Sequence, residues 1–322
     1  MARPRHPRRG SMQFWPRARS RHPLARIRSW AKETKVKPLG FIGYKAGMIH
    51  VQVTNNRPKS ITKGETIAMA STIVDCPPMV VAGAVFYKKT LSGLQAFATV
   101  LAEKTSKDLA RQFPLPKKAT KKIGEVAQYD DARLLVHSQP TLASTGARKP
   151  KLLEIALGGS PQDKLAYIKS MLGKEITVND IFNRGAQIDV HGITKGKGFQ
   201  GTVKRYGIPI RQHKAEKTKR GIGNLGSWTP KRVEFSVALP GKMGYHLRTE
   251  YNKQLLRLGA NGEEVTSTGG IIKYGVVRGA YALLKGSIIG PQRRAVVLTQ
   301  SIRPNRYEVK EAPEITYLSV QK

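Results

Sequence analysis

The sequence predicts a mainly β fold with an α insertion (α+β class), in which a β-barrel carries a helical insertion and two long basic extensions. Three observations predict it. Strand-like apolar segments come first, helix signals follow, and strand-like segments return towards the C-terminus. Two stretches hold most of the positive charge and are broken by Pro and Gly. No repeat period and no heptad run is present in the 322 residues.

The first part of the barrel is expected over residues 38–90. Residues 41–53 are typical of a strand, a turn and a second strand, because two Gly interrupt an apolar run. Residues 66–74 and 79–87 are rich in β-branched side chains and predict further strands.

The insertion is expected over residues 91–182. We expect a helix over 104–113 and a short buried strand over 134–137. The clearest helix signal begins at Ser160, a good N-cap that Pro follows at the first helical position, and ends at Gly173.

The remaining barrel strands are expected after the insertion. Apolar segments at 187–190, 270–277, 280–284 and 295–299 are short and separated by Gly and Pro. The predicted organisation is therefore a basic N-terminal arm (1–37), the first part of the barrel (38–90), a mixed α/β insertion (91–182), a barrel strand (183–192), a basic central extension (193–257), and the rest of the barrel with the C-terminal tail (258–322).

The charge of the chain points to a polyanionic partner. There are 57 Lys and Arg against 21 Asp and Glu, a formal net charge of +36. Residues 1–37 hold 12 Lys and Arg against one Glu, and residues 193–257 hold 15 against three. Lys and Arg in such excess repel one another unless a partner neutralises their charge. The first candidate for that partner is a phosphate backbone, and the second is an anionic membrane.

Several other classes are disfavoured. A single cysteine, Cys76, allows no internal disulfide and no Cys-rich zinc site. The longest clear apolar run, residues 79–86, is far shorter than a membrane span, and the N-terminus lacks the apolar stretch of a secretory signal. The seven His are scattered without metal-ligand spacing, and no nucleophile or acid–base constellation is present. We expect no enzyme activity, cofactor, metal, membrane span or homo-oligomer.

One motif resembles a cofactor loop. Gly196-Lys-Gly-Phe-Gln-Gly201 matches GxGxxG, but a dinucleotide site needs a helix to open at the third Gly, and Gly207 and Pro209 interrupt any such helix. We expect instead a glycine-rich loop that brings backbone and cations close to RNA phosphates, with a plain flexible loop as the alternative.

Aromatic side chains interleave with these basic segments. Trp15 lies in the arm, and Trp228 lies between Gly and Pro in the central extension. Rings stack on unpaired RNA bases while cations pair with phosphates. The alternatives are a solvated tail for the arm and a Trp228 that packs back onto the barrel.

Several motifs, in collinear order along the chain, resemble those of one known family. They are Pro7–Ser11, Phe14–Arg17, Gly43–Met48, Asn179–Phe182, Thr194–Gly201 with Lys204-Arg205, Gly226–Pro230, Gly244–Glu250 with Asn252-Lys253, Leu284–Ser287 and Gly290-Pro291. Together they resemble the universal large-subunit ribosomal protein L-three family in its archaeal/eukaryotic form. Ile49 and Tyr206 depart from the family pattern, and residues 91–175 resemble it least.

The resemblance implies a fold and a role. Family members have a translation-protein-type closed β-barrel with an inserted helical lobe, and two extensions that reach into large-subunit (23S-type) rRNA. The central extension approaches the peptidyl transferase centre, and Trp228 matches the aromatic residue at its tip. The family acts early in subunit assembly, does no chemistry itself, and has ribosomal proteins L-fourteen and L-thirteen as neighbours in the cytoplasmic ribosome.

We therefore expect a non-enzymatic rRNA-binding protein. The predicted rRNA-binding residues are Arg3, Arg8, Arg9, Trp15, Arg17, Arg19, Lys45, Lys195, Lys197, Gly198, Gln200, Lys204, Arg205, Arg211, Lys219, Arg220, Trp228, Lys231, Arg232, Tyr245, His246, Arg248 and Lys253. Two other interpretations stay open: an RNA-modifying enzyme with basic arms, and a DNA-compacting or membrane-surface protein, which would need basic amphipathic helices.

Overall fold

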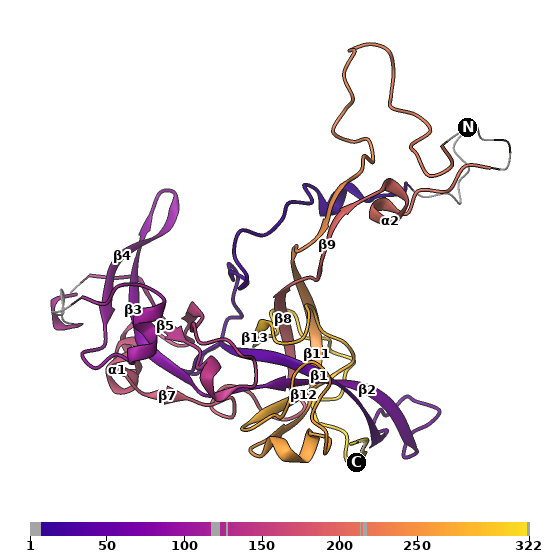
Figure 1. Cartoon of the computed structure of the whole chain (residues 1–322). Coiled ribbons are helices and arrows are strands. Elements are labelled where there is room, and N and C mark those ends of the chain that lie inside the picture. The colour runs from indigo at the N-terminus through magenta and orange to yellow at the C-terminus, as the bar shows by residue number, and fades with distance from the viewer. Residues whose placement is uncertain (1–7, 117–122, 127, 213, 215–217, 321–322) are drawn as a thin grey trace. The chain divides into compact units, whose positions relative to one another are not determined.

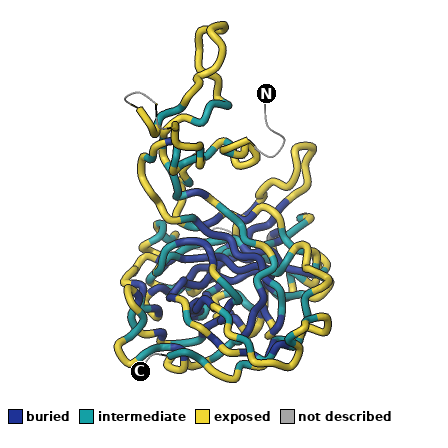
Figure 2. Tube along the Cα trace, turned by 90° about the vertical axis from the view of Figure 1, so that its right-hand side faces the viewer, coloured by how far each residue is buried: buried dark blue, intermediate teal, exposed yellow. Residues whose placement is uncertain are grey.

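The computed structural model describes residues 8–116, 123–126, 128–212, 214 and 218–320. The chain divides into two compact units. One, here called the body, comprises Pro23–Gly192 and Thr249–Lys322; the other, the extension unit, comprises Met1–His22 and Ile193–Arg248. Buried residues are concentrated in the body, and most of the extension unit is exposed or half-buried (Figure 2).

A seven-stranded sheet forms the first part of the body (Figure 1). Its order is β13-β8-β11-β12-β2-β1-β14, and β1 also pairs with β13. The strands are β1 (Gly40–Thr54), β2 (Thr66–Asp75), β8 (Gln187–Ile193), β11 (Leu247–Gly259), β12 (Tyr281–Lys285), β13 (Ala295–Gln300) and β14 (Ile315–Leu318). The predicted strands at 66–74, 280–284 and 295–299 are thereby confirmed.

Strand β1 organises this sheet. It pairs antiparallel with β13, β2 and β14. The predicted turn within 41–53 is wrong: the chain stays extended for 15 residues, with register shifts between Lys45 and Gly47 against β2 and between Gln52 and Val53 against β14. The glycines serve close packing instead, since a Cβ at Gly43 would lie 2.5 Å from a methyl of Val74, and one at Gly47 would lie 2.6 Å from a methyl of Ile271.

A second, five-stranded sheet occupies the insertion. Its order is β4-β3-β5-β6, and β7 pairs with β3. The strands are β3 (Met79–Thr90), β4 (Gly93–Leu101), β5 (Asp131–His137), β6 (Leu152–Ala156) and β7 (Glu175–Ile176). The insertion is thus mainly β and not a helical lobe. The expected boundary between the barrel and the insertion, at 90/91, falls in the turn between β3 and β4. Because β3 belongs to the second sheet, the predicted strand at 79–87 is part of the insertion and not of the first sheet.

Helices are few and short. The helix after Ser160 is confirmed as α1 (Pro161–Met171), with the Ser160 hydroxyl accepting from the Asp163 amide at 3.3 Å. The helix predicted over 104–113 is only a 3-10 helix, η2 (Lys107–Arg111), since it buries Leu109 alone and has no apolar stripe to pack. The other elements are η1 (Met12–Phe14), η3 (Ile123–Glu125), η4 (Pro140–Leu142), β9 (Gly196–Gln200), α2 (Thr202–Tyr206), β10 (Gly241–Gly244) and η5 (Gly262–Val265).

Two further expectations are corrected. Residues 270–277 form no strand but a turn closed by one isolated bridge between Ile271 and Gly275. The expected N-terminal arm is shorter than 37 residues, because its second half packs on the body. Ala25 and Ile27 are buried there, and the Trp30 ring fills the space beside Gly40, where a Cβ would meet it at 2.9 Å.

A buried polar cluster links β1, β2 and the loop before β12. The Tyr274 hydroxyl donates to the Asp75 carboxylate at 2.6 Å, and the Tyr44 hydroxyl bonds that of Ser138 at 2.8 Å. Asp75 is 1% exposed. Burial, only partly offset by the bond from Tyr274, raises the pKa of Asp75 to about 6.

We expect this carboxyl to make stability depend on pH. Its pKa in the folded chain lies above the ordinary ~3.9, so its stabilising contribution is complete below about pH 4 and is lost as the pH rises through 6. The difference in unfolding free energy between the wild type and Asp75→Asn should therefore fall by about 2 kcal/mol from pH 4 to pH 7. Denaturant titrations at intervals of half a pH unit measure it.

The matched control is Glu103→Gln, which removes an exposed carboxylate. Its difference from the wild type should stay nearly constant over the same range. A constant difference for Asp75→Asn as well would show that Asp75 titrates normally.

Candidate nucleic-acid interface

The glycine-rich motif forms regular structure in the extension unit. Residues of Gly196–Gln200 are strand β9, paired antiparallel with β10 (Gly241–Gly244), so the expectation of a loop is wrong here. Gly244 has φ +77°, and a Cβ there would lie 2.0 Å from the Lys195 carbonyl oxygen. Gly201 then caps α2, which lasts only five residues before Gly207 ends it in the left-handed conformation.

The N-terminal arm packs against the central extension through an aromatic cluster. The Trp15 ring lies 5.7 Å from the Tyr206 ring and 6.0 Å from the Phe235 ring, measured between centroids. The guanidinium of Arg17 lies 4.2 Å from the centre of the Tyr206 ring, and that of Arg205 lies 4.9 Å from it. Arg17 also donates to the Arg205 carbonyl at 2.7 Å. Burial lowers the pKa of Arg17, which nevertheless stays cationic at neutral pH.

A second contact fixes the arm at His246. The imidazole Nδ1 lies 2.8 Å from the Ala18 carbonyl oxygen, and Nε2 accepts from the Gly244 amide at 3.1 Å. This pattern requires the neutral ring with its proton on Nδ1, because the carbonyl oxygen only accepts. The Ser20 amide donates to the Tyr245 carbonyl at 2.8 Å.

Two further cation–ring contacts tie the arm to the central extension. The guanidinium of Arg19 lies 5.2 Å from the Tyr245 ring centre, and that of Arg248 lies 5.4 Å from the Phe14 ring centre. The two predicted extensions therefore form one folded unit in which the arm and the central extension supply each other's packing. Tyr206, Phe235 and Phe14 belong to this packing, and none of them was among the predicted rRNA-binding residues.

Many of the predicted cations remain available to a ligand. The exposed ones are Arg8, Arg9, Arg19, Lys195, Lys197, Lys204, Arg211, Lys219, Arg220, Lys231 and Arg232. Gly198, with φ +66° and open space around it, and the half-buried Gln200 lie beside them in β9.

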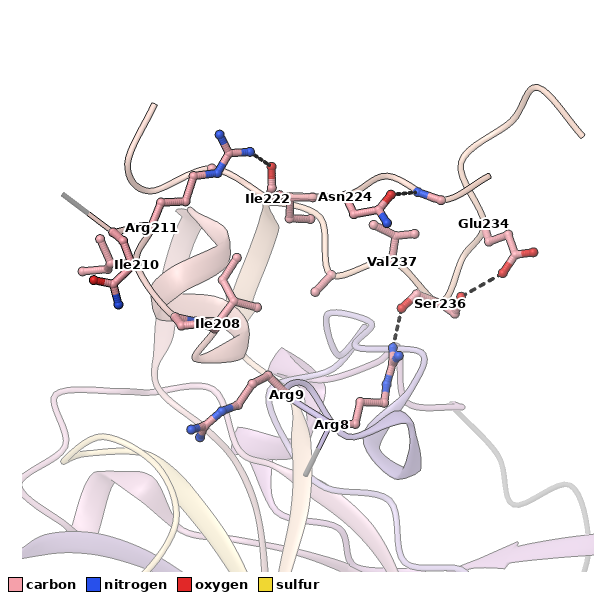
Figure 3. A pocket seen from close by; sticks show the side chains of 16 residues that line it. Arg8, Arg9, Ile208, Ile210, Arg211, Ile222, Asn224, Glu234, Ser236 and Val237 are labelled. Atoms are coloured by element: carbon pink, nitrogen blue, oxygen red, sulfur yellow. Dashed lines mark hydrogen bonds between the residues drawn. The ribbon is translucent and has the colours of Figure 1, made fainter. Parts of the chain in front are cut away.

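Some of these cations rim a cavity of about 670 Å³ in the extension unit (Figure 3). Arg8 and Arg9 line it together with the apolar side chains of Ile208, Ile222 and Val237. Arg8 donates to the Ser236 carbonyl, which links the arm to the extension at the cavity. Apolar walls with a cationic rim suit an unpaired base whose phosphate lies at the edge.

Trp228 is the most exposed aromatic residue of the extension unit, at 84%. Its loop is shaped by backbone bonds: the Gly226 amide donates to the Asn224 side chain at 2.8 Å, and the Lys231 amide donates to the Trp228 carbonyl at 2.8 Å. The ring is thus not packed into a core, contrary to the alternative weighed from the sequence.

Three predicted residues lie elsewhere. Lys45 is 9% exposed in the body, where its ammonium donates to the carbonyls of Ile288 and Gly290, so its role is structural. Lys253 lies in the body part of β11 and pairs with Glu250 at 3.1 Å. Arg3 lies outside the described residues.

Other kinds of site have no support among the described residues. The described part of the chain holds no group of three or more His, Cys, Asp or Glu able to bind a metal ion. Cys76 is buried and free. None of the described helices is long and apolar enough to cross a membrane.

Comparison with known proteins shows the family to which the chain belongs. The model of the ribosomal protein L3 family matches residues 1–132 and 117–321. Large ribosomal subunit protein uL3 of Methanocaldococcus jannaschii is 43% identical over 322 residues, covering 97% of this chain and 96% of that protein. The protein of the same name from Methanothermobacter thermautotrophicus is 42% identical over 331 residues, covering 99% and 98%. Both of these relatives come from archaea, and the chain therefore belongs to the ribosomal protein L3 family, the family that its motifs resemble.

Proposed function

We propose that this protein is a structural constituent of the large ribosomal subunit that binds 23S-type rRNA through its extension unit. The observation that carries the proposal is the set of exposed Lys and Arg on a unit held together by its own aromatic side chains. Family membership confirms the prediction of a non-enzymatic protein, because this is a family of ribosomal proteins. The interpretation as an RNA-modifying enzyme has no support.

Contacts between the exposed cations and RNA phosphates would supply most of the binding free energy. Each cation that replaces a counterion on the RNA backbone releases that counterion to solution, and this release favours association. The cation–ring contacts of Arg17 and Arg205 hold the unit's shape, so the exposed cations meet the RNA from a defined surface. Close packing of rRNA helices becomes possible where their charges are neutralised.

Trp228 would act at the tip of the extension, near the peptidyl transferase centre. Its exposure leaves a whole indole face to stack on an unpaired base. Because stacking is local, this contact would shape one region of rRNA and add little to total affinity.

The body would be a closed β-barrel of six strands. The strand order β13-β8-β11-β12-β2-β1 ends on two strands that also pair with each other, and this supports a sheet that closes on itself. In such a sheet the central extension leaves from β8 and returns through the neighbouring β11. We further propose early entry into subunit assembly in the cytoplasm, with L-fourteen and L-thirteen as neighbours.

Affinity for rRNA should depend steeply on salt. If about ten phosphates are contacted, the association constant should fall roughly as the seventh to ninth power of salt concentration. Filter binding of the full chain to a large-subunit rRNA fragment between 0.1 and 0.4 M KCl measures the slope. A slope near zero would contradict phosphate-led binding.

Removing the central extension should leave a folded body that does not enter mature subunits. Thr194 and His246 already bond each other, since the Thr194 amide donates to the His246 carbonyl at 3.0 Å, so an Asn-Gly turn can replace residues 195–245. Circular dichroism checks folding, and sedimentation of tagged protein in cells measures incorporation. Normal incorporation of this variant would refute the proposal.

Trp228→Ala should leave rRNA affinity within about twofold of wild type and still impair translation by purified subunits, because one stacking contact of about 1–3 kcal/mol is small beside many phosphate contacts. Phe199→Ala is the matched control, since that ring is also 72% exposed on the extension unit. Equal translation rates for Trp228→Ala and wild-type subunits would exclude a role at the tip.

A further inference from the structure

The second sheet of the body has an open edge. Its strand order, β4-β3-β5-β6, places β4 at one end, and no strand among the described residues pairs with the outer edge of β4. The hairpin of β3 and β4 also runs past the next strand (Figure 1): pairing of β3 with β5 stops at Tyr87, whereas pairing with β4 continues to Thr90 and Gly93. A row of main-chain donors and acceptors is therefore available to a further strand.

The register identifies the residues whose main chain faces outwards. The Ala102 amide donates to the Ala82 carbonyl at 2.9 Å, and Thr99 lies opposite Val85 in the same register. In an antiparallel pair, positions that exchange hydrogen bonds alternate with positions that do not. Since residues 82 and 102 bond each other, Thr99 and Leu101 are at the alternate positions, and their amides and carbonyls point away from β3.

This edge lacks most of the features that keep exposed strands from pairing with other chains. Residues 90–102 contain no Asp, Glu, Lys, Arg or Pro, although 24% of the whole chain is charged. Leu91 is fully exposed there, and Leu94 is 47% exposed. One protective feature is present, a β-bulge that shifts the register between Phe86 and Tyr87. An uncharged, partly apolar edge promotes aggregation unless a partner covers it.

The chemistry of the edge favours a protein strand over RNA. Phosphates are bound chiefly by cations, and β4 contains none. The regular row of amides and carbonyls along a strand is matched by another extended polypeptide. A charged residue on the incoming strand would meet no opposite charge in β4, so the segment that fits is itself uncharged and rich in β-branched residues. A second copy of this chain fits poorly, because two chains with a net charge of +36 repel each other.

We propose that β4 accepts an extended, uncharged segment of another large-subunit protein as a further strand of the second sheet. The inference rests on the proposed function, because it takes the large subunit as the place where this partner is met. The incoming strand bonds the outward amides and carbonyls of Thr99 and Leu101, and its apolar side chains cover Leu94. The second sheet then has no open edge at β4.

The test is photocrosslinking in purified large subunits that contain the full chain with p-benzoylphenylalanine at position 94. We expect a crosslink that survives ribonuclease treatment and that mass spectrometry maps to a single segment of one other protein. The matched control carries the same probe at position 61, because Ile61 is fully exposed in the loop between β1 and β2. The control should give no crosslink to that segment.

Thr99→Pro in the probe-bearing chain tests the main-chain pairing. Proline has no amide hydrogen, and at an outward position it removes no hydrogen bond to β3. The crosslink yield should fall about tenfold, because a main-chain bond to the incoming strand is lost and the proline ring hinders its approach. Thr268→Pro places the same residue in an exposed turn of the body and should leave the yield unchanged. Thermal unfolding checks that both variants fold.

The crosslink from position 94 decides the partner even where Thr99→Pro does not fold. A crosslink to rRNA or to a second copy of this chain, or the absence of any protein crosslink, would overturn the inference. So would an undiminished yield in a folded Thr99→Pro variant. All of these results leave the proposed function intact, whereas failure of the wild-type chain to sediment with large subunits would contradict the proposed function itself.

Discussion

The pairing of strands around β1 is the constraint on which the body depends. This one strand bonds β13, β2 and β14, and so connects segments from the start and the end of the chain. The same sheet places β8 beside β11, the two strands from which the central extension leaves and to which it returns. Fixing both ends of a long excursion lowers the entropy that its ordering costs. A highly basic segment can then be shaped without a large hydrophobic core of its own.

The extension unit meets its excess charge by using cations as packing groups. Arg17 and Arg205 lie against the Tyr206 ring, and the hydrogen bond from the Arg17 guanidinium to the Arg205 carbonyl fixes the arm to the central extension. A guanidinium stacks on an aromatic face while it keeps its in-plane donors for other partners. Some basic residues of this unit therefore maintain its shape, others are exposed to a ligand, and Arg8 and Arg19 do both.

The insertion differs most from expectation, and the reason is physical. Strand β4 is largely exposed, so this strand has no period-2 pattern of burial. The stretch 104–113 contains good helix formers, yet only Leu109 is buried. Local propensity without an apolar stripe does not sustain a helix, whereas Ser160, Pro161 and Gly173 punctuate one that forms.

The sequence by itself determined the mainly β class, the family, the strands at 66–74 and 295–299, and the location of the excess charge, because composition, capping and β-branched runs are local properties. Only the tertiary structure decided that Trp15 and Arg17 pack on Tyr206, that Lys45 is buried against backbone carbonyls, and that Gly43 and Gly47 lie within one continuous strand. Each of these depends on a partner distant in sequence. An Arg or a Gly has the same local preferences whether it meets RNA, a tyrosine ring or a neighbouring strand, so its role is settled by what the fold brings next to it.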